Sequence, residues 1–107
     1  MPIPQVRPEQ VKQRLDAGEE DLVLLDVREV EELALARIEG AIHVPMDEIP
    51  ASLDRLDRAA DYVVVCHHGM RSAMVCNFLS GQGYPRVANL SGGIDAWYRL
   101  DPSVGRY

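Results

Sequence analysis

A five-residue apolar run at 62–66 (YVVVC), with three consecutive valines, constrains the fold of this chain more than any other feature. β-Branched side chains favour extended strands, and an apolar run without polar alternation is typical of a strand buried on both faces. A similar run at 22–26 and shorter ones at 41–45 and 86–90 predict three further strands. A sheet that is buried on both faces needs helices to cover it.

Segments with helical patterning separate these strands. They lie at 8–18, 29–35, 49–56, 72–82 and 93–100. The first has a proline near its start and a glycine just past its end, which is the usual asymmetry of a helix. Strands that alternate with short helices predict an α/β domain with a mainly parallel sheet.

Size and charge exclude several classes of protein. The chain has 107 residues and a net charge of −6 at pH 7, with 47% hydrophobic and 26% charged residues. This composition is too apolar for disorder, and the length predicts one domain over residues 1–107. No apolar run is long enough to span a membrane, and the acidic balance argues against nucleic-acid binding. The first residues lack an export signal and two cysteines cannot form a disulfide scaffold, so we expect a cytoplasmic monomer.

The charge is unevenly distributed. Residues 1–61 hold 15 acidic and 7 basic side chains, whereas residues 62–107 hold 2 acidic and 4 basic ones. A small anionic ligand would therefore be sought in the second half. The alternative is that acidic surface helices simply cluster early in the chain.

The segment that follows the strand at 62–66 carries the strongest chemical signal. It reads Cys66-His67-His68-Gly69-Met70-Arg71-Ser72. Ligands bind beyond the carboxyl ends of parallel strands, and Cys66 falls at such an end. Gly69 allows a tight turn whose N–H groups can face an anion, and we expect Ser72 to cap the next helix. The helix N-terminus and Arg71 both favour the thiolate over the thiol, which predicts a nucleophilic cysteine that meets an anionic substrate.

Four segments in this order resemble the rhodanese family of sulfurtransferases. They are residues 25–29 (LDVRE), 38–45 (IEGAIHVP), the loop at 66–72 and residues 90–97 (LSGGIDAW). The resemblance implies a three-layer α/β fold with a central, mainly parallel five-stranded sheet flanked by helices. It also implies a catalytic Cys66 that carries sulfane sulfur as a persulfide, with no metal or organic cofactor. Two segments depart from the family pattern: Ala36-Arg37 replace the usual Gly-His, and 100–104 lack the usual glycine.

The resemblance implies a reaction with two displacements. Cys66 takes sulfur from thiosulfate or a similar anionic donor and passes it to a thiol or cyanide. We expect the other six residues of the loop to bind the substrate, with Arg71 holding the donor's anionic end. A cysteine phosphatase is a rival, but its loop has five residues between cysteine and arginine where this chain has four. A non-catalytic interaction module is a second rival, because some rhodanese-like domains lack the cysteine.

Other residues admit two interpretations. Asp26 and Arg28 form the family's Asp-x-Arg motif and either border the pocket or make a structural ion pair. His67 and His68 either tune the choice of acceptor or are exposed loop side chains. Adjacent ligands without a second spaced pair fit a zinc site at Cys66-His67-His68 poorly, so we expect no metal there.

Two further side chains need placing. Cys76 lies in the helix at 72–82 and is either a core residue or a thiol that resolves the persulfide. Trp97, in the last helix, either packs in the core or forms a pocket wall, because Gly92-Gly93 precede that helix and would bring it near the loop.

Overall fold

A parallel sheet runs through the middle of the molecule in a computed structural model that describes residues 2–107; Met1, the first residue of the predicted domain, lies outside the described residues. The strand order is β1-β5-β4-β2-β3, and every neighbouring pair is parallel. The strands are β1 (Gln5–Val6), β2 (Leu22–Asp26), β3 (Ile42–His43), β4 (Asp61–Val65) and β5 (Val87–Leu90). The predicted α/β fold with a five-stranded sheet flanked by helices is confirmed.

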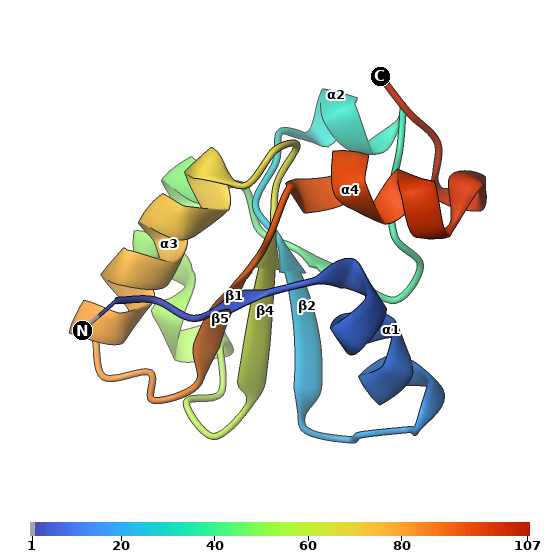
Figure 1. Ribbon diagram of the computed structural model, residues 1–107. Helices are drawn as coiled ribbons and strands as arrows, with labels where there is room; N and C mark the ends of the chain where they lie inside the picture. The colour runs from blue at the N-terminus through green and yellow to red at the C-terminus, as the bar shows by residue number, and fades with distance from the viewer. Residues whose placement is uncertain (1) are drawn as a thin grey trace.

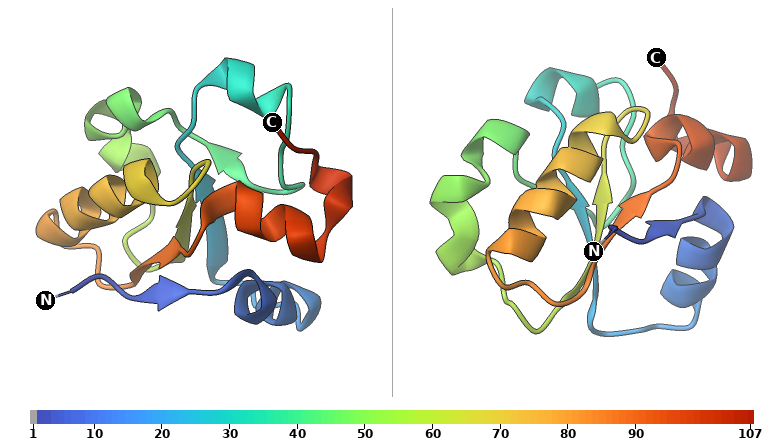
Figure 2. Two further views of the ribbon diagram at one scale, coloured as in Figure 1. Left: turned by 45° about the horizontal axis from the view of Figure 1, so that its top comes forward. Right: turned by 60° about the vertical axis from the view of Figure 1, so that its left-hand side comes forward.

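Helices cover both faces of this sheet. These helices are α1 (Pro8–Asp16), α3 (Met70–Gly81) and α4 (Gly93–Leu100), while α2 (Val30–Leu33) lies beyond the carboxyl ends of the strands (Figure 1). Helix α3 and the segment at 46–55 lie on one side, and α1 and α4 lie on the other (Figures 1 and 2).

The two central strands explain why their sequences show no polar alternation. Successive side chains of a strand point to opposite faces. Leu25 and Val64 belong to the hydrophobic cluster beneath α3, while Leu24 and Val63 belong to the cluster beneath α1 and α4. Both faces of the sheet are covered, so the residues of β2 and β4 other than the terminal Asp26 and Asp61 are apolar.

The structure differs from the sequence-based prediction at several elements. The predicted helix at 49–56 is two 3₁₀ segments, Met46–Glu48 and Pro50–Arg55. Pro45 precedes the first segment and Pro50 begins the second. Neither proline has the N–H that a continuous α-helix needs. Strand β1, between two prolines, has only two residues and is too short to give a pattern. Helix α3 begins at Met70, two residues before the predicted start.

Loops after three strands meet at the carboxyl edge of the sheet. Asp26 pairs in register with Val65, so the residues that follow β2 and β4 leave the sheet side by side. The segment after β5 joins them, because Ile94 N–H donates to Cys66 O at 2.8 Å. This edge is where the sequence places the reactive cysteine.

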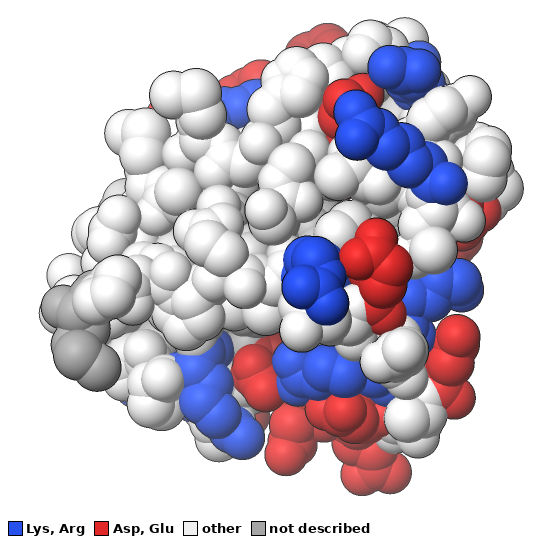
Figure 3. Space-filling view, viewed as in Figure 1, with Lys and Arg blue, Asp and Glu red and all other residues white. Residues whose placement is uncertain are grey.

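Charge gathers away from α3. In Figure 3 the acidic and basic side chains crowd the lower part of the molecule around α1, whereas the surface over α3 is largely uncharged. Met70 and Met74 of α3 are among the large apolar side chains on the surface. Within residues 2–107, no helix is both long and apolar enough to cross a bilayer.

Candidate active site

Cys66 lies directly after β4 and is only 1% exposed. Its Sγ accepts a hydrogen bond from Gly69 N–H at 3.0 Å and lies 3.2 Å from Ser72 Oγ. Gly69 has a φ of +106°, a left-handed conformation that favours glycine, and it is the N-cap of α3. The loop therefore turns back on the sulfur and directs the Gly69 N–H at it.

The first turn of α3 has N–H groups without acceptors in the helix. Met70 and Arg71 occupy its first two positions, where a helical N–H has no acceptor within the helix. The aligned peptide dipoles also make this end of the helix partly positive. Gly69, the N-cap of α3, places its N–H against Cys66 Sγ, so the start of the helix faces the sulfur. That this cysteine acts as a thiolate stays a prediction.

Ser72 does not cap this helix, contrary to the prediction. It is fully buried in the first turn, and its hydroxyl donates to Asn89 Oδ1. Asn89 in turn donates through Nδ2 to Gly69 O at 3.0 Å and to Gln5 Oε1 at 3.1 Å. Gly69 can start the helix without a side-chain cap, which leaves Ser72 free to link the sulfur to the sheet. Asn89 was not found from the sequence, although an amide within the buried run VANL was a usable signal.

Arg71 is held by a residue that the sequence did not point to. Its two terminal nitrogens donate to the two carboxylate oxygens of Glu32, at 2.6 and 2.8 Å. The Arg71 hydrogen bonds lower the pKa of the Glu32 carboxyl to about 2, against the opposing effect of burial. Those same bonds raise the pKa of Arg71. The guanidinium is positioned near Cys66 but already has an anionic partner.

The two histidines differ in their surroundings. The ring of His67 stacks between His68 and Tyr107, with both centroid distances 3.9 Å, and its Nε2 lies 3.1 Å from Tyr107 O. His68 is exposed, and Met70 is 80% exposed. His67 is half-buried, so it is not the freely exposed side chain that one interpretation predicted.

The comparison with known proteins decides the family. The profile of the rhodanese-like domain matches residues 7–100. The chain belongs to the rhodanese-like family. A sulfurtransferase of Allochromatium vinosum is 43% identical over 91 residues, covering 85% of this chain and 84% of the relative. The protein YtwF of Bacillus subtilis is 42% identical over 97 residues, covering 91% and 92%.

Solved structures agree with this assignment. A rhodanese-related protein from Thermoplasma volcanium superposes with a TM-score of 0.82 at 31% identity, covering 92% of this chain and 93% of that one. The reduced CoADR-RHD protein of Bacillus anthracis gives a TM-score of 0.85 at 28% identity, covering 98% of this chain and 18% of that one. The rhodanese-like fold thus extends over nearly the whole sequence.

The motif residues Asp26 and Arg28 of this rhodanese-like domain form a buried ion pair. Their side chains are 2% and 0% exposed, and Arg28 Nη2 lies 2.7 Å from Asp26 Oδ2. Arg28 also donates to Ala36 O at 2.7 Å and to the Tyr107 hydroxyl at 3.0 Å. This geometry is that of the structural alternative, because neither side chain reaches a surface that a substrate could touch.

The segments that depart from the family pattern contact each other. Arg37 N–H donates to Val104 O at 2.8 Å, and the nearby Gly105 has a φ of +92°. The chain therefore has a glycine turn in this region, at a position that the family pattern does not mark. Its effect is to bring Tyr107 back to the active-site loop.

Cys76 and Trp97 belong to the core. Cys76 is fully buried, and burial raises the pKa of its thiol to about 12. Trp97 is 2% exposed in the cluster beneath α4. Both side chains therefore have the packing role, which is one of the two interpretations that the sequence allows.

Proposed function

We propose that this chain is a sulfurtransferase that takes sulfane sulfur from thiosulfate, holds it as a Cys66 persulfide, and passes it to a thiol or cyanide. Support comes first from its relatives, since the 43% identical protein of Allochromatium vinosum is named a sulfurtransferase and a 36% identical one of Actinobacillus succinogenes a thiosulfate sulfurtransferase. The observation that carries the proposal is the Cys66 sulfur, which accepts the Gly69 N–H at the start of α3.

The first displacement loads the enzyme. The Cys66 thiolate attacks the outer sulfur of thiosulfate and forms a new S–S bond. The bond between the two thiosulfate sulfurs breaks, and sulfite leaves with its electron pair. The Gly69 N–H and the N–H groups of Met70 and Arg71 stabilise the negative charge that moves from the cysteine sulfur to the terminal sulfur.

The second displacement unloads it. A cyanide or thiolate acceptor attacks the terminal sulfur, the Cys66 S–S bond breaks, and the cysteine leaves as a thiolate. With cyanide the product is thiocyanate. Neither step consumes an oxidant or a reductant, so the residues of the loop suffice for the cycle. We propose that the protein works as a cytoplasmic monomer on these small molecules and needs neither a cofactor nor a nucleic acid.

The test measures thiocyanate formed from thiosulfate and cyanide. The wild type is expected to turn over and Cys66→Ala to be inactive, while the matched variant Cys76→Ala keeps the activity. Mass spectrometry after thiosulfate treatment should find one added sulfur atom on Cys66. Activity that survives in Cys66→Ala overturns the mechanism. If the wild type gains no sulfur, the result supports an interaction module. If it hydrolyses an aryl phosphate faster than it transfers sulfur, the result supports a phosphatase.

A further inference from the structure

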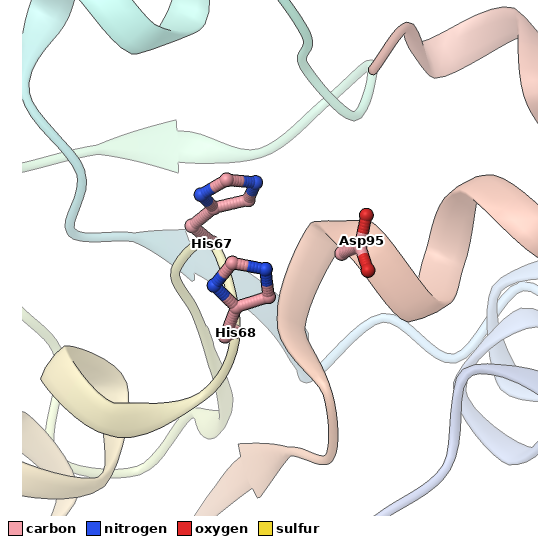
Figure 4. Close-up of side chains that lie close together, drawn as sticks. All are labelled: His67, His68 and Asp95. Atoms are coloured by element: carbon pink, nitrogen blue, oxygen red, sulfur yellow. The ribbon is translucent and has the colours of Figure 1, made fainter. Parts of the chain in front are cut away.

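A second group of side chains lies beside the cysteine. His67, His68 and Asp95 each offer one ligand atom, and these atoms lie within 4.8 Å of one another. Figure 4 shows the two imidazoles on the loop after β4 and the carboxylate on the first turn of α4, with the carboxylate beside the two rings. The chemistry of the sulfur-transfer cycle does not use Asp95.

Backbone hydrogen bonds fix the spacing of the group. Asp95 N–H donates to His67 O at 3.1 Å, and Ile94 N–H donates to Cys66 O at 2.8 Å. The approach is so close that a Cβ on Gly93 would lie 2.4 Å from Cys66 O. Because the two backbones are locked together, the histidines and the carboxylate are held as neighbours without any bound ligand.

We propose that His67, His68 and Asp95 form a three-ligand site for Zn²⁺. Imidazole nitrogens and a carboxylate suit zinc, whereas calcium and magnesium prefer sites built wholly from oxygen. Three protein ligands leave a fourth position open to water or an anion. Ligand atoms around tetrahedral zinc lie about 3.3 Å apart, so the group must contract by about 1.5 Å at most. An imidazole lone pair lies in the plane of its ring, so the stacked rings of His67 and His68 must also separate before both can bind one ion. The exposed His68 can make both movements by turning about its side-chain bonds.

Two interactions at the end of the chain compete with the cation. Arg106 Nε lies 3.4 Å from Asp95 Oδ1, and Tyr107 O lies 3.1 Å from His67 Nε2. Zinc beside the carboxylate is repelled by the positive guanidinium unless Arg106 moves away. The Arg106 side chain is 60% exposed, so its release into water costs little.

The test is a titration with Zn²⁺ at pH 7.5, with competition by a chromophoric chelator. The wild type should bind one equivalent. Asp95→Asn should weaken binding by at least about tenfold, as should the exposed-site variant His68→Ala. The control Asp54→Asn, an exposed acidic residue elsewhere, should leave affinity unchanged. Arg106→Ala should tighten binding about two- to fivefold, because the competing charge is gone.

A substitution at the cysteine separates this site from a thiolate site. Cys66→Ser should bind Zn²⁺ as the wild type does, and the Co²⁺ complex should show tetrahedral bands without sulfur-to-metal charge transfer. The proposal is overturned if Cys66→Ser abolishes binding, if neither Asp95→Asn nor His68→Ala weakens it, or if the wild type binds no zinc. Urea unfolding, followed by Trp97 fluorescence, identifies any variant that fails to fold. If Asp95→Asn fails to fold, the zinc affinity of His68→Ala, whose substitution is on the surface, decides whether the proposal stands.

Zinc bound at this site should also affect sulfur transfer, an expectation that rests on the proposed function. His67 directly follows Cys66, so a bound cation lies beside the sulfur and should slow its loading from thiosulfate. The zinc concentration for half-inhibition should rise in Asp95→Asn by the same factor as the dissociation constant. Binding is measured without any turnover, so a protein that binds zinc but transfers no sulfur contradicts only the proposed function.

Discussion

Gly93→Ala tests whether the contact between the active-site loop and α4 holds the site together. A Cβ at this position would lie 2.4 Å from Cys66 O and 2.5 Å from His67 O, distances that side-chain carbons do not adopt. The backbone φ is also +62°, which L-residues rarely take. The loop and the helix must therefore move apart, and the two hydrogen bonds from Ile94 and Asp95 weaken or break.

The expected decrease in the free energy of unfolding of Gly93→Ala combines several effects. An alanine in the left-handed region costs about 1–2 kcal/mol, and overpacking a tight contact costs about 1–3 kcal/mol. Each weakened hydrogen bond removes up to about 1 kcal/mol. These overlap, because separation relieves the clash, so we expect the free energy of unfolding to fall by about 3–5 kcal/mol out of a total of about 5–15.

Two other glycines give matched controls for the same chemical change. Gly40 has a φ of +84° but open space around its Cβ position, so Gly40→Ala should cost only the conformational part, about 1–2 kcal/mol. Gly81, in the last turn of α3, has open space and an ordinary φ, so Gly81→Ala should stabilise by about 0.5–1 kcal/mol.

The assay is urea unfolding followed by the fluorescence of Trp97, the single tryptophan, which is a buried residue of α4. The order of stability should be Gly81→Ala, wild type, Gly40→Ala, Gly93→Ala. If Gly93→Ala is no less stable than Gly40→Ala, the close approach of the two backbones has no energetic weight and the reasoning fails. Sulfur loading should also fall in Gly93→Ala even under conditions where it is folded.

Three other expectations follow from buried or paired groups. Arg28→Met leaves the Asp26 carboxylate buried without its partner and should destabilise by about 3–5 kcal/mol in urea unfolding, with partial recovery in the double variant that adds Asp26→Asn. The Glu32 pKa of about 2 lies below its ordinary value of 4.5, so the ionised carboxylate stabilises the folded protein fully above pH 4.5 and progressively less as pH falls toward 2. The difference in free energy of unfolding between wild type and Glu32→Gln should shrink over that range. Burial raises the Cys76 pKa to about 12, so in Cys66→Ala iodoacetamide at pH 8 should label Cys76 only after unfolding.

The sequence was sufficient where one strong local pattern decided the outcome. The central strands β2 and β4 lie within one residue of their predicted bounds, because burial on both faces demands continuous apolar runs. Strand β1 has no such pattern, since two residues cannot show a period, and it forms only because the finished sheet offers it an edge at β5. The segment at 50–55 has a helical pattern, which predicts a helix but does not distinguish a 3₁₀-helix from an α-helix.

The active site also combines residues that local sequence identifies with residues that only the fold brings together. Cys66 and Gly69 are close in sequence, so local turn chemistry identified them. Asn89, Glu32 and Tyr107 reach the loop from residues 17 to 40 positions away, and only the fold brings them there. Ser72 departs from its predicted role for a related reason. Its hydroxyl could cap the helix locally, but it bonds instead to the buried amide of Asn89 on β5.

Arg71 provides a further test, because its charge is already paired. The sequence predicts that Arg71 holds the anionic end of the sulfur donor, yet its guanidinium contacts both oxygens of Glu32. An anionic donor that uses Arg71 must therefore compete with a carboxylate. Glu32→Gln removes the competing charge and keeps the size of the side chain, and it leaves the donors to Cys66 Sγ in place.

We expect the KM for thiosulfate to fall about five- to tenfold in Glu32→Gln, which corresponds to about 1–1.4 kcal/mol, with kcat little changed. Glu31→Gln, an exposed neighbour, changes the net charge equally and should leave KM as it is. The gain should shrink at high ionic strength, because part of it is screened attraction. A higher KM in Glu32→Gln would contradict the competition, since it would mean that the carboxylate holds Arg71 in its working position and that the donor binds a guanidinium which is still paired.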